Sequence, residues 1–549
     1  MLRRTMSRRD LLRLAGSGAL ALGGAGALGA CALPATLEPA QPAASPAFTP
    51  DLDLTMRAAS TEVQILPGPK TTVWSYQATV HAGDPAAAQA IPGSYLGPII
   101  RARSGQKVRI TFENALPEPD QESIIHWHGL HLPAAVDGHP SDAVKPGERY
   151  VYEFTVANRA GTYWFHPHPH GKTGRQVMMG MAGLFLVSDA EEQAAGLPSG
   201  AQDIPLVIQD RAFDAQNQIV YGLDMMSQMM GFLGERVLVN GTPDVTLDLA
   251  TRAYRLRLLN GSNSRIYKLA WDDATPLTVI ASDGGLLEAP VSRPFVMLAP
   301  GERVELWADF RDRPLGAELR LVSQPFAGAE GVGAPGEAGG MGGMGGMQHG
   351  NMGGMGGTAG TASAPALGAA LDILRVRIAR QEAEPLTLPA RLATIPRHRR
   401  EDAVNKDNPR PVALTMNGMQ WQLNGRSYEM NAVAPEEIVR LDTLEVWEII
   451  NEQNPGAMMD AMGMAHPIHI HGGQFQVIGR AVLPELQAGW AGVKDGYLDE
   501  GWKDTVLVMP GERVRLLMAF RDHAGAFVYH CHNLEHEDAG MMRNYRVEA

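Results

Sequence analysis

Near the carboxyl end of the chain, residues 530–541 read His-Cys-His-Asn-Leu-Glu-His-Glu-Asp-Ala-Gly-Met. This segment offers a thiolate from Cys531, an imidazole from His536 and a thioether from Met541. These are the ligand types of a blue-copper centre, which takes two histidines, one cysteine and a weak axial methionine. Only one histidine of that set is local, so the second must come from another part of the chain.

The histidines on either side of Cys531 point to a second metal site. Residues 527–529 lead into them as an expected strand, and side chains on a strand alternate between its two faces. His530 and His532 should therefore face away from Cys531. The same His-x-His spacing recurs at His126-Trp127-His128, His166-Pro167-His168 and His469-Ile470-His471.

Four such pairs supply enough imidazoles for about three ions, if each ion takes two or three nitrogens, as copper does. His466, three residues before His469, is then left to complete the blue-copper set. A single His-x-His pair would more simply indicate an exposed strand or a zinc site. Four pairs with a cysteine inside one of them favour copper, because thiolate and imidazole together select it.

The motifs around these residues resemble those of the multicopper oxidases, and they are most similar to those of bacterial cuprous oxidases of the copper-efflux type. The matching segments read His126-Trp-His-Gly, Trp164-Phe-His-Pro-His-Pro-His-Gly-Lys-Thr-Gly174, His466-Pro-Ile-His-Ile-His-Gly472 and His530 through Met542. The resemblance implies a type 1 (blue) copper at His466, Cys531, His536 and Met541. It also implies a trinuclear cluster of one type 2 and two type 3 coppers, where dioxygen is reduced to water, held by His126, His128, His166, His168, His469, His471, His530 and His532.

The resemblance also assigns roles to three carboxylates near the ligands. Glu537 is the expected proton donor to the cluster, and Asp137 is expected to orient water there, because a general acid must stand within hydrogen-bond reach. Asp504 is expected to hold His466 through its second ring nitrogen, as metal-bound histidine usually requires. The alternative for each is a solvated surface carboxylate.

One departure concerns the site for the substrate Cu(I). The cuprous oxidases place an aspartate four residues, and a methionine two residues, before the first blue-copper histidine. Here Met464 matches that methionine, but Met462 replaces the aspartate, and Asp460 lies two residues further back. The substrate-copper site is therefore expected to be displaced or weaker than in those relatives.

Three strand-and-turn units repeat along the chain, which predicts repeated folding units. Each has an alternating strand that ends in asparagine, a Pro-Gly-Glu-Arg turn, and a second strand behind the turn. The units are expected at 109–114, 146–149 and 150–156, then at 255–260, 300–303 and 304–310, and last at 445–451, 510–513 and 514–520. Short strands with turn signals at these spacings predict Greek-key β-sandwiches, which the resemblance makes cupredoxin-like.

We therefore predict an all-β protein of three cupredoxin-like Greek-key β-sandwich domains, since 549 residues are too many for one core. The domains are expected at 51–195, 196–380 and 381–549. The first and third carry every predicted ligand, so the trinuclear site should lie between them, with the middle domain as a spacer.

Residues 1–50 are interpreted as an export signal followed by a Pro/Ala-rich linker. Arg8 and Arg9 precede a moderately apolar run, which is typical of a twin-arginine signal and of a periplasmic protein. That run is too rich in glycine to predict a membrane span, and we expect none in the mature chain. Cleavage after Ala32 is preferred. The alternative is a lipoprotein box that leaves Cys31 acylated.

The net charge and the cysteine content limit the classes of partner and of structure that we expect. The formal net charge is −13, which argues against nucleic-acid binding and suits cationic substrates, although acidic surfaces also serve solubility. The only cysteines are Cys31 and Cys531, so there is no disulfide framework to infer. We expect a monomer.

Methionines gather in three places. A Gly/Met-rich insertion at about 328–370 cannot form a core, and its thioethers suit Cu(I), although it could be a plain linker. Residues 225–230 carry methionines at helical spacing, which more often indicates core packing. A third group, 458–464, directly precedes His466 and would lie over the point of electron entry.

These features favour an oxidase that couples oxidation of Cu(I) to reduction of dioxygen, in copper tolerance. The alternative is a laccase-like oxidase of phenols, which would need an open pocket over His466 rather than thioethers. A third hypothesis, a non-enzymatic copper store, would leave a complete dioxygen-reducing ligand set without a purpose.

Overall fold

The computed structural model describes residues 44–329, 364–418, 420–451 and 463–549. All of the described residues belong to one compact unit, residues 35–549. The expected export signal with Cys31, most of the Gly/Met-rich insertion, Asp460 and Met462 lie outside the described residues. Within the described ranges, no helix is both long and apolar enough to cross a membrane.

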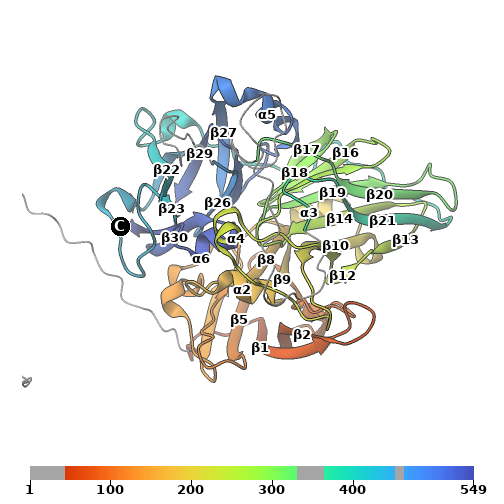
Figure 1. Ribbon diagram of the computed structural model, residues 1–549, viewed down its shortest axis with the longest axis horizontal. Coiled ribbons are helices and arrows are strands. Elements are labelled where there is room, and N and C mark those ends of the chain that lie inside the picture. The colour runs from red at the N-terminus through yellow and green to blue at the C-terminus, as the bar shows by residue number, and fades with distance from the viewer. Residues whose placement is uncertain (1–43, 330–363, 419, 452–462) are drawn as a thin grey trace, which may run out of the picture. The chain divides into compact units, whose positions relative to one another are not determined.

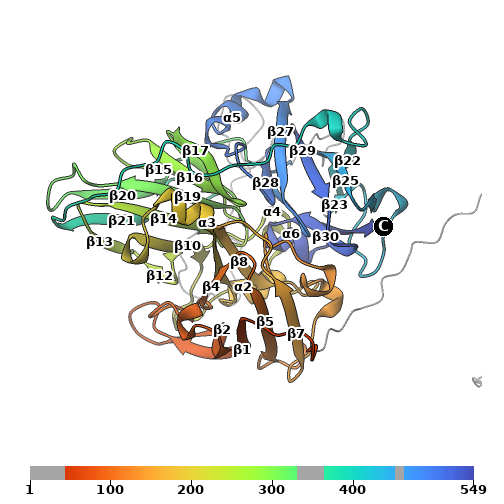
Figure 2. The same cartoon turned by 180° about the vertical axis from the view of Figure 1, so that it is seen from behind.

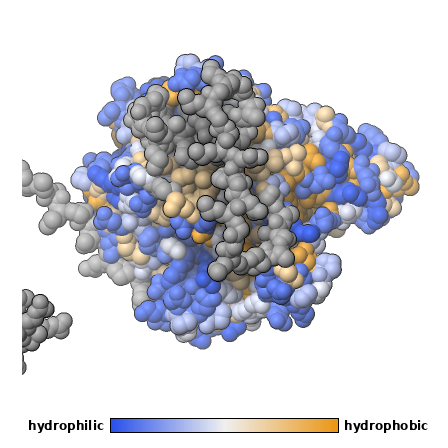
Figure 3. Space-filling model, viewed as in Figure 1, coloured by the Kyte–Doolittle hydropathy of each residue, from blue (hydrophilic) through white to orange (hydrophobic). Residues whose placement is uncertain are grey.

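The predicted fold class is confirmed: the described part of the chain is built from strands that form six sheets, two in each of three cupredoxin-like sandwiches (Figure 1). Each sandwich has its own buried hydrophobic cluster. In Figure 3, blue hydrophilic residues dominate the described surface on the visible face, and orange hydrophobic residues are scattered among them.

The first sandwich, drawn in red to orange in Figure 1, packs a sheet of order β2-β1-β5-β7 against one of order β3-β4-β9-β8-β6. Its strands are β1 (Leu52–Val63), β2 (Thr71–Ala82), β3 (Ala88–Gln89), β4 (Ile99–Arg103), β5 (Lys107–Ala115), β6 (Ile125–His126), β7 (Arg149–Thr155), β8 (Gly161–Pro167) and β9 (Gly183–Ser188). Two short helices, α2 (Thr173–Met178) and α3 (Ala190–Ala195), flank β9 in sequence. Figure 2 shows β1, β2, β5 and β7 together as one layer.

The middle sandwich has a sheet of order β12-β11-β10-β14-β19-β16-β17 and a sheet of order β13-β21-β20-β15-β18. Its strands are β10 (Asp203–Arg211), β11 (Arg236–Val239), β12 (Thr242–Pro243), β13 (Thr246–Ala250), β14 (Ala253–Asn260), β15 (Tyr267–Trp271), β16 (Leu277–Ser282), β17 (Gly285–Arg293), β18 (Val296–Leu298), β19 (Arg303–Asp309), β20 (Glu318–Ser323) and β21 (Leu371–Arg380). The helix α4 (Met225–Met230) lies between β10 and β11 in sequence.

The last sandwich, in blue, has sheets of order β23-β22-β25-β29-β27 and β24-β31-β30-β26-β28. Its strands are β22 (Arg410–Asn417), β23 (Gln420–Leu423), β24 (Ile438–Arg440), β25 (Thr443–Ile450), β26 (His466–Ile470), β27 (Phe475–Val482), β28 (Thr505–Val508), β29 (Glu512–Phe520), β30 (Gly525–Cys531) and β31 (Met542–Glu548). Its α-helices are α5 (Gln487–Ala491) and α6 (Leu534–Asp538).

The three predicted repeat units are present, and the same hydrogen bonds hold each one. The asparagine-ended strands correspond to β5, β14 and β25, and Asn451 directly follows the last residue of β25. The second strands form β7, β19 and β29. In each unit the asparagine side chain donates to two backbone carbonyls: Asn114 to Gln121 and Val144, Asn260 to Arg265 and Leu298, and Asn451 to Met464 and Val508. The asparagine thus ties the end of its strand to two other segments, because a buried amide must find partners.

The repeats also share a parallel pairing that a simple up-and-down sheet lacks. The first long strand of each sandwich pairs in parallel with the asparagine-ended strand: β1 with β5, β10 with β14, and β22 with β25. The domain boundaries proposed at 195/196 and 380/381 stay a prediction. They fall between β9 and β10 and between β21 and β22.

His139 links the first sandwich to the last and supplies a test of the packing by pH. Its Nε2 lies 2.8 Å from Asn544 Oδ1, its Nδ1 lies 2.8 Å from Ser141 Oγ, and burial lowers its pKa to about 4. As the pH falls below about 6.5, the unfolded chain protonates this imidazole and the folded chain does not, so stability is lost between that pH and the folded pKa.

We expect His139→Gln to lack this loss. Between about pH 7.5 and about pH 5, the free energy of unfolding of the unaltered chain should fall by about 2 kcal/mol more than that of the variant. Denaturant unfolding at both pH values measures the difference, and all other titrating groups cancel because both chains share them. Parallel pH dependences would show that His139 is not held neutral.

Candidate metal centres

The pairing of β30 with β26 places the two predicted sites on opposite sides of one strand. Ile468 is the pairing partner of Cys531, and His469 is the partner of His530. Because neighbouring residues of a strand face opposite ways, Cys531 meets His466 and His536, whereas His530 meets His168 and His471. The structure therefore has two groups of candidate metal ligands that are only one residue apart in the chain.

The first group surrounds a buried thiol. Cys531 Sγ lies 3.4 Å from His466 Nδ1 and 3.6 Å from His536 Nδ1, and it accepts a hydrogen bond from the backbone N–H of Asn533. Met541 is fully buried in the same hydrophobic cluster as Cys531, and the two residues are joined by a backbone hydrogen bond. The predicted thiolate, imidazole and thioether ligands are thus brought together.

Burial makes this group ready for a cation. It raises the pKa of the Cys531 thiol, so that in the absence of metal the sulfur keeps its proton. It lowers the pKa of His536 to about 3 and also lowers that of His466, so both rings keep a free lone pair. A metal ion can take the place of the thiol proton, because cysteine binds metal as the thiolate and releases its proton when it does so.

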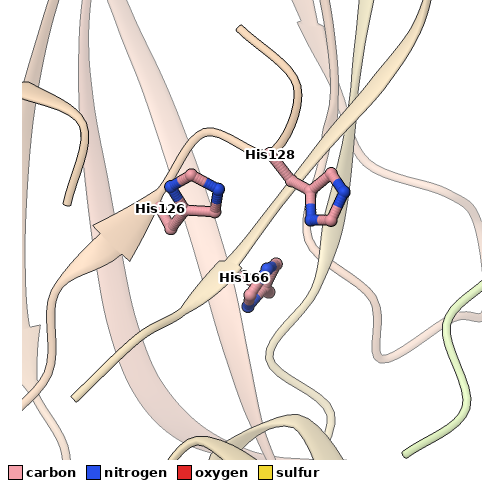
Figure 4. Close-up of side chains that lie close together, drawn as sticks. All are labelled: His126, His128 and His166. Carbon is pink, nitrogen blue, oxygen red and sulfur yellow. The ribbon is translucent and has the colours of Figure 1, made fainter. Parts of the chain in front are cut away.

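The second group contains the paired histidines, all of them buried. The rings of His126, His128 and His166 lie close together, with His126 on β6 and His166 on β8 (Figure 4). The closest approaches join His126 Nε2 to His469 Nε2 at 3.2 Å, His471 Nε2 to His530 Nε2 at 3.2 Å, and His168 Nε2 to His530 Nε2 at 3.3 Å. His532 packs beside this group, with ring centroids 5.0 Å from His128 and 5.2 Å from His166.

The nitrogens of this second group fit metal ions better than they fit one another. Burial lowers the pKa of seven of these rings, that of His166 to about 4, so each of the seven is neutral and offers one lone pair. They are His126, His128, His166, His168, His469, His471 and His532. The outer nitrogens are engaged: His126 Nδ1 donates to the Asp137 carbonyl and His469 Nδ1 to the Asp504 carbonyl, each at 2.7 Å. Among the described residues, several nitrogens of these rings have no hydrogen-bond partner, and buried polar atoms without partners are costly unless an ion meets them. They are His128 Nδ1, His166 Nε2, His168 Nδ1 and both nitrogens of His532.

Two of the predicted carboxylates lie against these rings. Asp137 Oδ2 is 2.7 Å from His471 Nδ1, and burial raises the pKa of the Asp137 carboxyl. Glu537 Oε2 is 3.1 Å from His530 Nδ1, and its other oxygen is 3.6 Å from His168 Nε2. Both are almost fully buried, so neither is a solvated surface carboxylate.

The expectation that Asp504 holds His466 is wrong. Its Oδ1 lies 3.0 Å from His128 Nε2, and its carbonyl accepts from His469. The reason is the antiparallel register of β26 and β28: His469 pairs with Thr505, whereas His466 pairs with Val508, so Asp504 lies at the far end from His466. Among the described residues, His466 Nε2 has no hydrogen-bond partner.

The methionine-rich helix α4 is only partly a packing element. Met229 is buried and Met230 is partly buried against the last core, but Met225 and Met226 are 67% and 51% exposed. The carbonyl of Met229 accepts from both His536 Nε2 and Trp421 Nε1, each at 2.8 Å. Sequence reasoning missed Trp421 and this carbonyl, because a backbone contact between distant segments leaves no mark in residue types.

Two carboxylates, the buried Glu535 and the half-buried Asp538, hold helix α6, which carries His536. Glu535 accepts hydrogen bonds from the Tyr221 hydroxyl and the Asn263 amide of the middle sandwich, at 2.8 and 2.9 Å. Asp538 accepts from the backbone N–H of Thr173 in the first sandwich at 2.9 Å. The position of His536 therefore depends on all three sandwiches.

Known proteins match this chain both in sequence and in structure. A family model described as "Multicopper oxidase" matches residues 72–192, and another with the same description matches residues 403–549. A laccase of Bacillus stratosphericus is 30% identical over 86% of this chain and 90% of its own length, and "Multicopper oxidase mco" of Staphylococcus haemolyticus is 29% identical over 83% of each. The crystal structure of McoA multicopper oxidase from the hyperthermophile Aquifex aeolicus has a TM-score of 0.72 and 32% sequence identity, and the match covers 91% of this chain and 97% of that one.

The thiol group supplies a direct spectroscopic prediction. We expect Cys531→Ser to abolish the intense blue absorption and the oxidase activity, because a hydroxyl cannot supply the soft thiolate donor that the copper requires. Met541→Leu is the matched variant, and it should stay blue and active with a shifted reduction potential, since an axial ligand tunes the potential. Visible absorption and redox titration measure both. A blue, active Cys531→Ser protein would refute the assignment, and an unshifted Met541→Leu protein would remove Met541 from the ligand set.

Proposed function

The chain belongs to the multicopper oxidase family, and we propose that it couples one-electron oxidation of Cu(I) to four-electron reduction of dioxygen to water. Members of this family are copper-containing oxidoreductases that use dioxygen and a reducing substrate such as a phenol or a metal ion. The choice of Cu(I) as the substrate and a role in copper tolerance are the proposed part.

Four copper ions are proposed, one type 1, one type 2 and two type 3. His466, Cys531, His536 and Met541 would hold the type 1 ion, and the paired histidines would hold the other three. Copper at these sites supplies one-electron chemistry and the reduction of dioxygen. The neutral imidazoles and the buried thiol support this assignment, because they form clustered donor sets in which several ring nitrogens have no hydrogen-bond partner among the described residues.

The chain's own residues connect the two groups and handle protons. The backbone between Cys531 and its neighbours His530 and His532 is the shortest covalent link from the thiol group to the histidine group. Glu537, which lies between the rings of His168 and His530, is proposed to pass protons inward. Asp137 is proposed to fix the His471 ring through Nδ1 and to orient water with Oδ1, which has no partner among the described residues.

One contact carries the choice of Cu(I) over a phenol: the Met229 carbonyl on His536 Nε2. An organic reductant that used this imidazole edge would need to contact or hydrogen-bond that nitrogen, and its hydrogen is already donated. Helix α4 and Trp421 also bury the ring completely. A small cation that thioethers deliver to the surface of α4 needs no such opening.

The surface above this contact suits a soft cation. Met225 and Met226 expose thioethers, which are ligands that Cu(I) prefers, and they stand on the helix whose carbonyl meets His536. The formal net charge of −13 also favours cations over anions. The Gly/Met-rich insertion, Met462 and Asp460 lie outside the described residues, so their part in binding Cu(I) remains a proposal from the sequence. The same holds for twin-arginine export to the periplasm and for acylation of Cys31.

A laccase-like oxidation of phenols is the second candidate. It is supported by the laccase of Bacillus stratosphericus and by the structure of a laccase-like multicopper oxidase from Ochrobactrum sp.. The latter protein has oxidase activity towards lignin model compounds, and its structure matches at 26% identity and a TM-score of 0.69. The two candidates differ in what the cap formed by α4 should do.

If α4 receives Cu(I), replacing its exposed thioethers should impair the oxidation of Cu(I) but not that of phenols. We expect Met225→Leu combined with Met226→Leu to lower kcat/KM for Cu(I) severalfold and to leave phenol oxidation and copper content unchanged, since leucine keeps the volume and removes the sulfur. Met430→Leu is the matched control on another surface segment. Equal Cu(I) kinetics in the double variant and the control would remove α4 from the proposal.

If α4 blocks phenols, removing it should open the site to them. Replacing residues 225–230 by a flexible Gly/Ser segment would remove the Met229 carbonyl from His536, and we expect phenol kcat/KM to rise severalfold while that for Cu(I) falls. Unchanged blue absorption verifies that the type 1 site survives. A fall in phenol oxidation by a variant that stays blue would contradict the proposed role of the cap.

A further inference from the structure

The turn that opens β19 in the middle sandwich reaches the histidine group, although none of the predicted ligands lies in that sandwich. Gly301 in this turn has a φ of +85°, and a Cβ there would come within 3.0 Å of His532 Cδ2 and 3.1 Å of His128 Cε1. The backbone of the middle sandwich thus packs directly on two of the rings. The expectation that this sandwich is only a spacer is too narrow.

Two residues further on, Arg303 uses every donor of its guanidinium in a fully buried position. Its Nη1 and Nη2 donate to the two oxygens of Asp504 at 2.7 and 2.5 Å, which is a bidentate pair. The remaining hydrogen bonds run to backbone carbonyls: Nε to Thr162, Nη1 to Gly301 and Nη2 to Asp283, at 3.0, 2.8 and 2.9 Å. Thr162 is on β8 of the first sandwich and Asp504 is in the last, so Arg303 joins all three sandwiches.

Asp504 connects Arg303 to His128. Its Oδ1 accepts from Arg303 and also lies 3.0 Å from His128 Nε2 and 3.0 Å from the Thr505 hydroxyl. With the Nε2 hydrogen donated to the carboxylate, the lone pair of His128 is on Nδ1, the nitrogen without a partner among the described residues. A carboxylate behind a metal-bound imidazole fixes the tautomer and the orientation of the ring. The carboxylate and the guanidinium also pack closely against Gly129, where a Cβ would overlap with Asp504 Oδ2 and Arg303 Nη2.

We infer that Arg303 is a positioning residue for the trinuclear site: it fixes the Asp504 carboxylate so that His128 presents Nδ1 to copper. The inference rests on the proposed function, since it needs copper on the paired histidines. It assigns the ligand-free middle sandwich a part in the affinity and geometry of the cluster, and it predicts that the type 1 site, which Arg303 does not touch, is independent of it.

Arg303→Lys tests this with the copper-loaded protein. Lysine keeps one positive charge beside Asp504 and Asp283, so no buried carboxylate loses its only cation, but it lacks the planar fork that holds both oxygens. We expect the chelator concentration that strips the trinuclear copper to fall by about 10- to 100-fold, the range for loss of an outer partner of a metal ligand. The electron paramagnetic resonance signal of the type 2 copper should change, whereas the blue absorption per chain should not.

Arg257→Lys is the matched control. Arg257 is likewise buried in the middle sandwich, pairs with Asp203 and Glu305, and donates to Thr162 Oγ1, but it does not touch Asp504. It should destabilise the same junction without altering chelator resistance or the resonance signal. If Arg257→Lys weakens the cluster as much as Arg303→Lys does, the effect is one of general stability and the inference fails.

A second variant covers the case in which Arg303→Lys does not fold. Gly301→Ala keeps the Arg303 and Asp504 side chains, but it strains the turn whose carbonyl accepts from Arg303 Nη1 and pushes on His128 and His532. It should therefore also change the type 2 signal and spare the blue absorption. Unaltered chelator resistance and an unaltered signal in whichever variant folds would overturn the inference. If the unaltered protein itself binds no copper beyond the blue ion, the proposed function fails instead.

Discussion

The alternation of side chains along β30, locked by its pairing with β26, is the constraint on which both metal groups depend. Because Ile468 pairs with Cys531 and His469 with His530, the thiol and the imidazole must face opposite ways and must each meet their own partners on β26. A slip of one residue would exchange the two environments and leave neither group complete. The three-sandwich fold serves to hold this register, with Asn451 tying the end of β25 to Met464, two residues before β26 begins.

The middle sandwich contributes no predicted ligand, yet it supplies fixed polar partners to both groups. At the histidine group it offers Arg303 and the turn at Gly301, and at the thiol group it offers the Met229 carbonyl and the Tyr221 and Asn263 side chains that hold α6 through Glu535. Ligand rings that are held from behind lose little freedom when a metal arrives, which is a general way to raise affinity without adding a ligand. The first and last sandwiches therefore carry the predicted ligands, and the middle sandwich orients them.

The sequence predicted most where residue type and spacing carry the signal. Paired histidines around Cys531 indicated two sites on opposite faces, and the asparagine-ended strands with their Pro-Gly-Glu-Arg turns indicated three equivalent units. It predicted least where a contact depends on register or on the backbone. The position of Asp504 in the sequence does not show which histidine it contacts. Only the pairing of His469 with Thr505 in the sheet shows this. Trp421, Met229 and Arg303 act through partners more than a hundred residues away, and no local pattern marks such contacts.

The predicted ligands come from two widely separated parts of the chain, so they are synthesised at different times. His126 to His168 are made early, but they remain half of the predicted site until the segment with Cys531 and His536 has been made and has paired with β26. Since domains fold as units from the amino end while the chain grows, the first sandwich must wait with its imidazoles facing an empty side. A truncated or stalled chain would consequently present several histidines but no closed site. Metal acquisition belongs to the finished protein, not to the nascent one.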